Sequence, residues 1–282
     1  MDWVPLIFID DVCHQLEYGT FEEVIELSDT WSEFAAEHSK ERREFVFSCK
    51  VNGQKMRYSF TNMTFMRMVV PDVFDRVTSV NICKSLDQLT NWDSLDELKL
   101  NVFPAVASIA ANCYWSCVTG DAHNQIFFEA FKNCPGFNEI RLKELGQESR
   151  DFVTRQVELG NVQKLQLFAR DSMNWTEPEQ LAETLGTFVN SARFHELTYR
   201  GLLLNDAELF ELFLERALAG ELEPGACISL DNIELEKSQR ISGLHPECRE
   251  NSERIAWRIP NSNRRVAVMD MNETFSMEVK RI

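Results

Sequence analysis

The sequence predicts an α/β fold in two parts: a helical segment over residues 1–42, and a solenoid of repeated strand–helix units with β-hairpin caps over residues 43–282. Three observations predict it: a recurring apolar phrase, amphipathic stretches between its copies, and alternating apolar residues at both ends of the longer part. With 44% hydrophobic and 26% charged residues and twenty Phe, the chain has the composition of a folded protein with a sizeable core.

The recurring phrase has apolar residues at its first, fourth and sixth positions. Its copies are Val77–Ile82, Leu95–Leu100, Phe137–Leu142, Val162–Leu167 and Phe194–Tyr199. The last two apolar positions flank a polar one, which is typical of a strand with one buried face. The copies begin 18, 42, 25 and 32 residues apart, a spread around the roughly 20–29 residues of leucine-rich repeats. The phrase therefore predicts divergent leucine-rich-like repeats.

Stretches with helical periodicity separate several copies of the phrase. Phe127 and Phe131 belong to one apolar face that ends at Pro135-Gly136, and Thr176 with Glu179 predicts a capping box before another. Alternating strands and helices indicate right-handed βα units and a parallel sheet. Residues 103–121 are apolar without a periodicity that distinguishes helix from strand, and residues 237–253 are polar and are expected to form a loop.

Both ends of the predicted solenoid show hairpin patterns. Phe45, Phe47 and Cys49 alternate before Asn52-Gly53, which is a strong signal for a two-residue turn. The C-terminal region repeats this pattern with Trp257, Ile259, Val266 and Val268. We expect these hairpins to cap the solenoid, because a terminal repeat cannot leave a bare apolar face.

The first 42 residues predict two amphipathic helices. Pro5 suits a first helical turn, and Phe8, Val12 and Leu16 follow it at helical spacing. This start, followed by a second helix that ends at Trp31, resembles an F-box, which begins with a Leu-Pro pair and ends its second helix near a Trp. Val4 stands where that family has Leu, and the third helix of the family would fall around residues 39–44. The wider layout resembles the F-box families that are expanded in nematodes.

The resemblance implies that the helices bind the Skp-type adaptor of a cullin–RING ubiquitin ligase. The residues that correspond to the motif are Val4, Pro5, Phe8, Ile9, Val12, Leu16 and Trp31. Packing of these helices on the neighbouring hairpin, without a partner, is the alternative interpretation.

The solenoid would then hold a target protein of unknown identity. Four polar residues lie inside the alternating part of the phrase and are expected to point away from the core: Lys99, Arg141, Gln166 and Thr198. Exposed sheet faces of solenoids bind proteins, and a merely solvated face is an equally good reading of these positions.

No active site is visible in the sequence. It contains five His, no HExxH, and no glycine-rich phosphate or nucleophile motif. The nearest metal-ligand patterns, His245 with Cys248 and Cys113 with Cys117, have no second pair at zinc-site spacing. We therefore predict a non-enzymatic, substrate-recruiting ligase adaptor without metal or cofactor. A repeat scaffold without ligase binding is the alternative, and an enzyme is a third reading that turnover of a substrate by the isolated chain would favour.

Charge and cysteine content bound the partners and the location. A formal charge of −16 would repel a phosphate backbone and anionic lipid, so neither nucleic acid nor a membrane surface is an expected partner. The eight Cys are irregularly spaced, and the start Met1-Asp2-Trp3-Val4 is acidic and lacks a signal-peptide pattern. These features predict reduced thiols in a cytoplasmic or nuclear protein.

Overall fold

The structure is a computed structural model, and the chain in it divides into two compact units, Met1–Glu139 and Ile140–Ile282. The residues that it describes are 4–16, 18–27, 29–52, 55–62, 74–82, 93–117, 124–143, 146–169, 178–201, 206–231, 248–249, 254–259, 261–271 and 274–281. The boundary between the units falls inside strand β6 (Phe137–Lys143).

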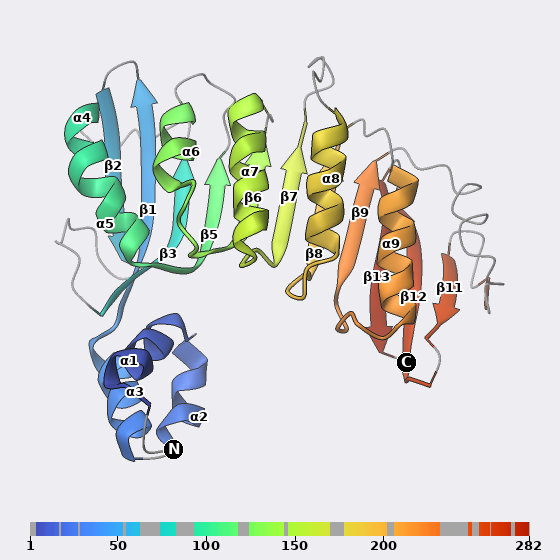
Figure 1. The fold of residues 1–282 in the computed structure, drawn as a ribbon, viewed down its shortest axis with the longest axis horizontal. Helices are drawn as coiled ribbons and strands as arrows, with labels where there is room; N and C mark the ends of the chain where they lie inside the picture. Colours follow the sequence, from blue (N-terminus) through green and yellow to red (C-terminus); the bar gives the residue numbers. More distant parts are fainter. Residues whose placement is uncertain are drawn as a thin grey trace. The chain divides into compact units, whose positions relative to one another are not determined.

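The first unit begins with helices (Figure 1). They are α1 (Leu6–Gln15), the 3₁₀ turn η1 (Tyr18–Thr20), α2 (Phe21–Ile25) and α3 (Asp29–Glu41). The helix expected around residues 39–44 is absent, because α3 continues to Glu41 and strand β1 begins at Arg43. Extended backbone is favoured there because Phe45 and Phe47 alternate and are both buried.

A mixed sheet follows in the first unit. Its strands are β1 (Arg43–Asn52), β2 (Lys55–Asn62), β3 (Asp75–Ile82), β4 (Asp93–Ser94) and β5 (Ala110–Cys117), in the order β4-β2-β1-β3-β5. β1 and β2 pair antiparallel from Phe45↔Asn62 to Asn52↔Lys55, so the predicted hairpin is present. Its register differs from the prediction, because a two-residue turn at Asn52-Gly53 would pair Val51 with Gln54, whereas Val51 pairs with Met56; Gly53 itself lies outside the described residues. β1 also pairs with β3 in parallel, and β3 pairs with β5 in parallel.

Helices cover one face of this sheet (Figure 1). They are α4 (Leu95–Glu97), the π-helix η2 (Leu98–Val102), α5 (Phe103–Ser108) and α6 (Gln125–Phe131). The core between helices and strands is aromatic: the Trp115 ring centroid lies 5.1 Å from that of Phe131 and 5.0 Å from that of Phe137. The ring of Phe103 lies 5.5 Å from that of Phe127. The ambiguous segment after residue 103 is therefore a helix followed by a strand.

The strand predicted at residues 95–100 is wrong, since these residues are helical. Leu95 and Leu98 are buried, whereas Leu100 is 76% exposed. Apolar residues at the first and fourth positions of the phrase are three apart, and this spacing also brings two residues to one face of a helix. Burial of Phe103 and Val106 continues the helical pattern and decides between the two readings.

The second unit contains the end of β6 and a mixed sheet that continues the strand order β6-β7-β8-β9-β13-β12-β11-β10. Its other strands are β7 (Lys164–Phe168), β8 (Glu196–Arg200), β9 (Cys227–Asp231), β10 (Cys248–Arg249), β11 (Arg254–Arg258), β12 (Arg264–Met271) and β13 (Thr274–Arg281). Its helices are α7 (Gln147–Leu159), α8 (Pro178–Val189) and α9 (Asp206–Leu218). β7, β8 and β9 pair in parallel, and β9 pairs with β13 antiparallel.

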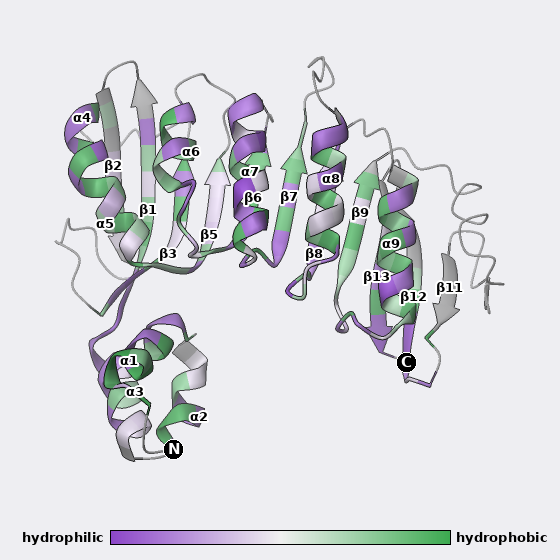
Figure 2. Ribbon diagram, in the orientation of Figure 1, coloured by the Kyte–Doolittle hydropathy of each residue, from purple (hydrophilic) through white to green (hydrophobic). Residues whose placement is uncertain are grey.

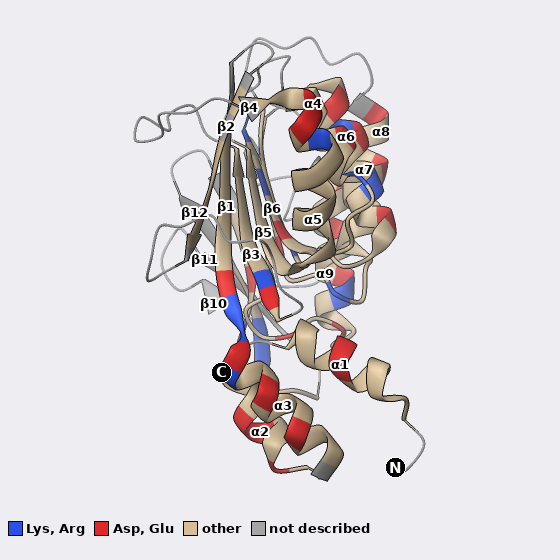
Figure 3. Ribbon diagram, turned by 90° about the vertical axis from the view of Figure 1, so that its left-hand side faces the viewer, with Lys and Arg blue, Asp and Glu red and all other residues tan. Residues whose placement is uncertain are grey.

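The sheet of the second unit has one face toward its helices and one face away from them. Leu165, Leu167, Leu197 and Tyr199 are fully buried on the helix side. Figure 2 shows the matching pattern in α7, α8 and α9, where hydrophobic and hydrophilic residues alternate along each helix. In Figure 3 these helices lie on the same side of the strands. The residues between the buried ones therefore point to the opposite face.

The predicted fold class, F-box-like helices followed by a leucine-rich-like solenoid with hairpin caps, needs correction. The structure is an α/β fold with mixed sheets, in which the predicted hairpin caps are integral strands. β1 has partners on both edges, and β13 lies between β9 and β12. Alternating apolar residues show that a strand has a buried face, but they do not show whether it has one neighbour or two.

Candidate partner-binding surface on the N-terminal helices

Helix α1 begins directly after Pro5. The carbonyl of Pro5 accepts hydrogen bonds from the amides of Phe8 at 2.9 Å and Ile9 at 3.2 Å. Proline fixes φ near the helical value and lacks the N–H that a first turn leaves unpaired, so this residue can start a helix without a side-chain cap. The helix position is thus set by the local sequence.

One side of α1 packs against the other N-terminal helices. Ile9 and Cys13 form a buried cluster with Phe21 of α2 and Ala35 of α3. Around it pack the partly buried side chains Val4, Leu16, Val24, Trp31 and Phe34. Burying a side chain such as Ile9 or Phe21 contributes about 1.5–3 kcal/mol as an upper estimate, so this cluster accounts for the packing of the three helices.

The other side of α1 exposes apolar side chains at its N-terminal end. Leu6 is 59% exposed, Ile7 72% and Phe8 52%. A helix turns about 100° per residue, so the consecutive apolar residues from Leu6 to Ile9 cannot share one buried face. Near the end of α2, Ile25 and Leu27 are also exposed. Contiguous exposed apolar residues of this kind indicate a surface that another protein covers.

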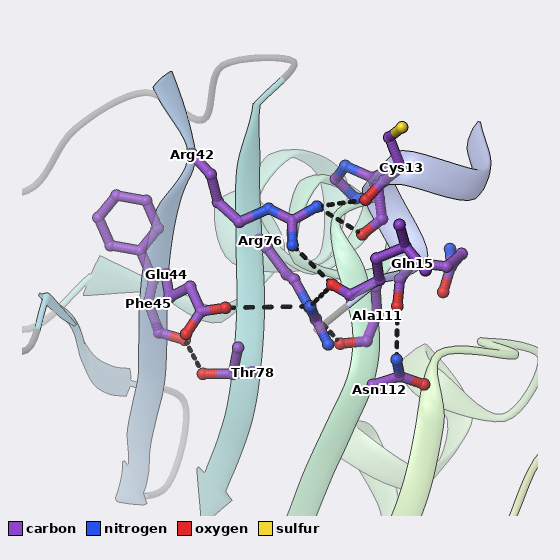
Figure 4. A network of polar contacts seen from close by, with 11 residues as sticks. Cys13, Gln15, Arg42, Glu44, Phe45, Arg76, Thr78, Ala111 and Asn112 are labelled. Atoms are coloured by element: carbon purple, nitrogen blue, oxygen red, sulfur yellow. Dashed lines mark hydrogen bonds and ion pairs between the residues drawn. The ribbon is translucent and has the colours of Figure 1, made fainter. Parts of the chain in front are cut away.

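The C-terminal end of α1 is held by arginines from elsewhere in the first unit (Figure 4). Arg42 donates hydrogen bonds to the carbonyls of Leu16 and Cys13, both at 2.6 Å, and to that of His14 at 3.2 Å. Arg76 on β3 donates to the Leu16 carbonyl at 2.6 Å and to the Ala111 carbonyl on β5 at 2.7 Å. The last carbonyls of a helix lack partners within it and carry partial negative charge, and guanidinium groups match both properties.

Further polar contacts surround this arginine anchor, which consists of Arg42 and Arg76. Asn112 donates its side-chain amide to the Gln15 carbonyl at 2.6 Å, and Asn112 adopts a left-handed backbone with φ of 45°. The guanidinium of Arg42 also lies 4.4 Å from the ring centroid of Phe21. Burial and the neighbouring Arg76 lower the pKa of Arg42 to about 10. The group therefore remains charged at neutral pH while it holds α1.

A histidine pair lies behind the same helix. Nε2 of His38 is 2.7 Å from a carboxylate oxygen of Asp10, and the side chain of His38 is 1% exposed. Burial, and next the charge of Arg42, lower the pKa of His14. These contacts tie the middle of α1 to α3, so both the middle and the end of the helix are fixed.

The residues predicted to bind the adaptor fall into different environments. Pro5 and Phe8 are exposed, and Val4, Val12, Leu16 and Trp31 are partly buried. Ile9 is buried in the helical cluster, so it supports the surface from inside and does not lie on it. The sequence analysis missed Leu6, Ile7, Ile25 and Leu27. The sequence could have identified Leu6 and Ile7 as exposed, because these apolar residues do not fit the helical spacing of Phe8, Val12 and Leu16.

The residues predicted for the target-binding face are only partly brought together. Lys99 lies on η2 in the first unit, exposed on a helix, so its predicted place in a strand is wrong. Gln166 and Thr198 are direct neighbours in the β7–β8 register, and Arg141 lies on β6. Nε2 of Gln166 donates to Glu196 at 2.8 Å.

In the part of the chain that the structure describes, no group of three or more His, Cys, Asp or Glu could hold a metal ion. A hollow of about 430 Å³ between α8 and α9 is lined by Glu179, Glu183 and Glu208 and by small or apolar residues. In the same described part, no helix has the length and hydrophobicity that crossing a bilayer requires.

Comparisons with known proteins place the chain in no family. No protein-family profile matches it, and no curated protein matches it. Solved structures that resemble it include complexes of the MycE methyltransferase from the mycinamycin biosynthetic pathway with Mg and SAH, and one that also contains mycinamycin VI. Identities are 10–11%, each comparison covers 99% of this chain and 93% of the other, and TM-scores are 0.26–0.27.

The strand order and pairing of the structure overturn the predicted leucine-rich-like solenoid. The predicted non-enzymatic ubiquitin-ligase adaptor is withdrawn as well, because the solenoid that was to hold the target is not the observed fold and no family profile or curated protein supports that role. Neither prediction is kept. At TM-scores of 0.26–0.27 and 10–11% identity, the likeness to these solved structures assigns this chain no fold, substrate, cofactor or activity.

Proposed function

We propose that the N-terminal helices form a protein-docking module whose contact residues are Leu6, Ile7 and Phe8. The observation that supports it is the exposure of these three side chains on a helix whose opposite side is buried. Burying one such side chain in an interface contributes up to about 1.5–3 kcal/mol, so a cluster of them can supply the core of a binding site.

The resemblance of the Val4-Pro5 start to an F-box makes a Skp-type adaptor the proposed partner. The surroundings of the surface restrict its chemistry further. Glu22, Glu23 and Glu26 are exposed on and just after α2, and Figure 3 shows acidic residues on each of the helices α1 to α3. An apolar partner surface with a neutral or basic rim would complement this module.

The proposal includes a cytoplasmic or nuclear location. Six cysteines are free thiols in the structure: Cys13, Cys49, Cys113, Cys117, Cys134 and Cys227. Reduced thiols are typical of proteins in the cytosol and nucleus.

Co-purification of the full chain with a Skp-type adaptor tests the module. The variant Ile7→Glu puts a charge into the proposed contact, and we expect it to weaken binding by at least about tenfold, since desolvating an unpaired charge costs more than 1.4 kcal/mol. The matched control is Leu100→Glu, because Leu100 is 76% exposed against 72% for Ile7 and lies outside the N-terminal helices.

The expected result is that the wild-type chain and Leu100→Glu retain the adaptor and Ile7→Glu loses it. Exposed positions tolerate substitution within about 0.5 kcal/mol, so a loss of binding by Ile7→Glu does not reflect unfolding. Absence of adaptor binding by the wild-type chain, or full binding by Ile7→Glu, would contradict the proposal.

A further inference from the structure

The hollow between α8 and α9 has an apolar lining. The two helices pack against each other on the helix side of the sheet (Figure 1). The volume of the hollow, about 430 Å³, lies within the range of small-molecule sites, about 300–1,000 Å³. Its apolar lining consists of the buried Leu209, the partly exposed Leu212 and Ala182.

Three exposed glutamates line the same hollow: Glu179 and Glu183 on α8, and Glu208 on α9. Residues four apart on a helix share a face with about 5–6 Å between their Cβ atoms, so the two carboxylates of α8 stand one turn apart. Among the described lining residues these carboxylates are the only polar side chains, and ionised carboxylates only accept hydrogen bonds. The lining thus offers acceptors and apolar surface, and no donor side chain.

A glycine keeps the space between these groups open. Gly186 lies in the interior of α8 and lines the hollow. Glycine is the least favourable helix residue apart from proline, and a Cβ at this position would have no atom within 4 Å, so packing within the chain does not require it. A solvated helix face would account for the exposed glutamates but not for this glycine. Glycine is typical of positions that a ligand approaches closely.

The adjoining parts of the sequence do not balance the negative charge. Together α8 and α9 contain six acidic residues and one basic residue, Arg216. Arg216 is in the last turn of α9, where it donates to the Ser191 carbonyl at 3.0 Å and to Glu221 at 2.9 Å. Residues 170–177 and 202–205, which precede the two helices, contain one Arg, one Asp and one Glu, so their summed charge is −1. The occupant of the hollow is therefore expected to be a cation.

The size and chemistry of the hollow select the kind of cation. A helix is about 10–12 Å wide, and a 10 Å length of it would need roughly 800 Å³, about twice the volume of the hollow. An extended peptide would leave its carbonyls without donor side chains from the described lining. A single metal ion does not fit either, because no group of three or more acidic, His or Cys side chains among the described residues could hold one. A linear chain of ammonium and methylene groups offers only donors and apolar surface.

We propose that the hollow binds a linear aliphatic polyamine, whose ammonium groups contact the three glutamates and whose methylene groups lie against Leu209 and Leu212. The stretch of α8 from Glu179 to Gly186 is about 10 Å long, comparable to an extended triamine such as spermidine. Ammonium groups joined by three or four methylenes match carboxylates one helical turn apart. The second unit carries this site, so it is independent of the N-terminal docking module.

Isothermal titration calorimetry of the full chain with spermidine tests the proposal. We expect a dissociation constant on the order of 0.1 mM. The shorter diamine putrescine should bind several-fold more weakly, because it reaches fewer carboxylates. At constant ionic strength, Mg²⁺ should not displace spermidine, since the carboxylates do not converge on one ion.

Gly186→Met fills the hollow and should weaken spermidine binding at least tenfold. Methionine favours helices, so this variant should melt at the wild-type temperature or above it, and the loss does not reflect unfolding. Glu183→Gln should weaken binding about two- to fivefold, as for an exposed ion pair. The matched control is Glu148→Gln, which removes the same charge from an exposed position on α7, outside the described lining, and should leave binding unchanged.

Absence of spermidine binding, wild-type binding by Gly186→Met, or equal weakening by Glu148→Gln would overturn the proposal. Displacement of spermidine by Mg²⁺ at constant ionic strength would show a counter-ion effect and would overturn it too. Tighter binding of a peptide of five Lys-Ser repeats than of spermidine would replace the polyamine with a basic protein segment and overturn the assignment.

Discussion

Replacing Arg42 with methionine tests whether the arginine anchor holds α1 in place. Methionine keeps much of the apolar stem and removes the guanidinium, which donates to the carbonyls of Cys13, His14 and Leu16. A hydrogen bond from a charged group contributes about 1.5–3 kcal/mol, and loss of the contact with Phe21 adds about 0.5–1 kcal/mol. Burying the charged guanidinium also costs free energy, as the lowered pKa of Arg42 indicates. Methionine removes this cost, which offsets part of the lost stability.

We expect a net loss of about 2 kcal/mol, because Arg76 still serves the Leu16 carbonyl after Arg42 is removed. Hydrogen exchange of α1 amides, followed by mass spectrometry, measures this locally, and 2 kcal/mol corresponds to about thirtyfold faster exchange. Lys40→Met is the matched control, since Lys40 is 81% exposed near the end of α3. It should leave the exchange of α1 unchanged.

The double variant with Arg76→Met distinguishes a shared anchor from two separate contacts. Both arginines donate to the Leu16 carbonyl, and each repels the other. Each single variant keeps one donor and relieves the repulsion, so the loss in the double variant should exceed the sum of the single losses by about 0.5–2 kcal/mol. Additive losses, or an Arg42→Met chain with α1 exchange as slow as in the wild type, would refute this reasoning.

Three further predictions follow from other buried groups. Burial lowers the pKa of His14 in the folded state below 6.5, so the unfolded chain binds more protons at this residue than the folded chain. The free energy of unfolding should therefore decrease as the pH falls below about 6.5, and urea titrations of His14→Gln should show a smaller decrease. A Cβ at Gly136 would lie 2.1 Å from the carbonyl oxygen of Ala110, so urea titrations of Gly136→Ala should show a free energy of unfolding lower by about 3 kcal/mol. The control Gly19→Ala, whose Cβ would have no atom within 4 Å, should change it by less than about 0.5 kcal/mol. Alkylation under denaturing, non-reducing conditions should modify all eight Cys, and Cys113 should react slowly in the native chain because burial raises its pKa; intact disulfides by mass spectrometry would contradict this.

The sequence was sufficient to predict those elements whose hydrophobic pattern fits only one type of secondary structure. Leu165 and Leu167, or Leu197 and Tyr199, alternate with polar residues and are buried in β7 and β8 as expected. Arg141 and Thr198 follow from the same alternation. It was not sufficient at Leu95–Leu100, where the apolar spacing fits a helix and a strand alike, and there the burial of Phe103 decided the outcome.

The candidate sites were harder to predict because their contacts join distant parts of the chain. Arg42 and Leu16 are 26 positions apart, and Arg76 and Leu16 are 60 apart. No local periodicity marks an arginine that will meet the end of a helix, so Arg76 reads as an ordinary polar residue near the start of a strand.

The two ends of α1 are best understood together. Ile7, at 72% exposed, gains little from folding, and a soluble helix would be more stable in water with a polar residue there. Yet the other end of the same helix is fixed by two buried arginines, an arrangement whose desolvation offsets much of its hydrogen bonding. Neither feature is explained by stability alone. Both follow if the chain holds an apolar contact in a fixed orientation before its partner arrives, because a preordered surface loses less conformational entropy on binding. By this argument, Arg42→Met should also weaken partner binding, although Arg42 lies outside the contact residues.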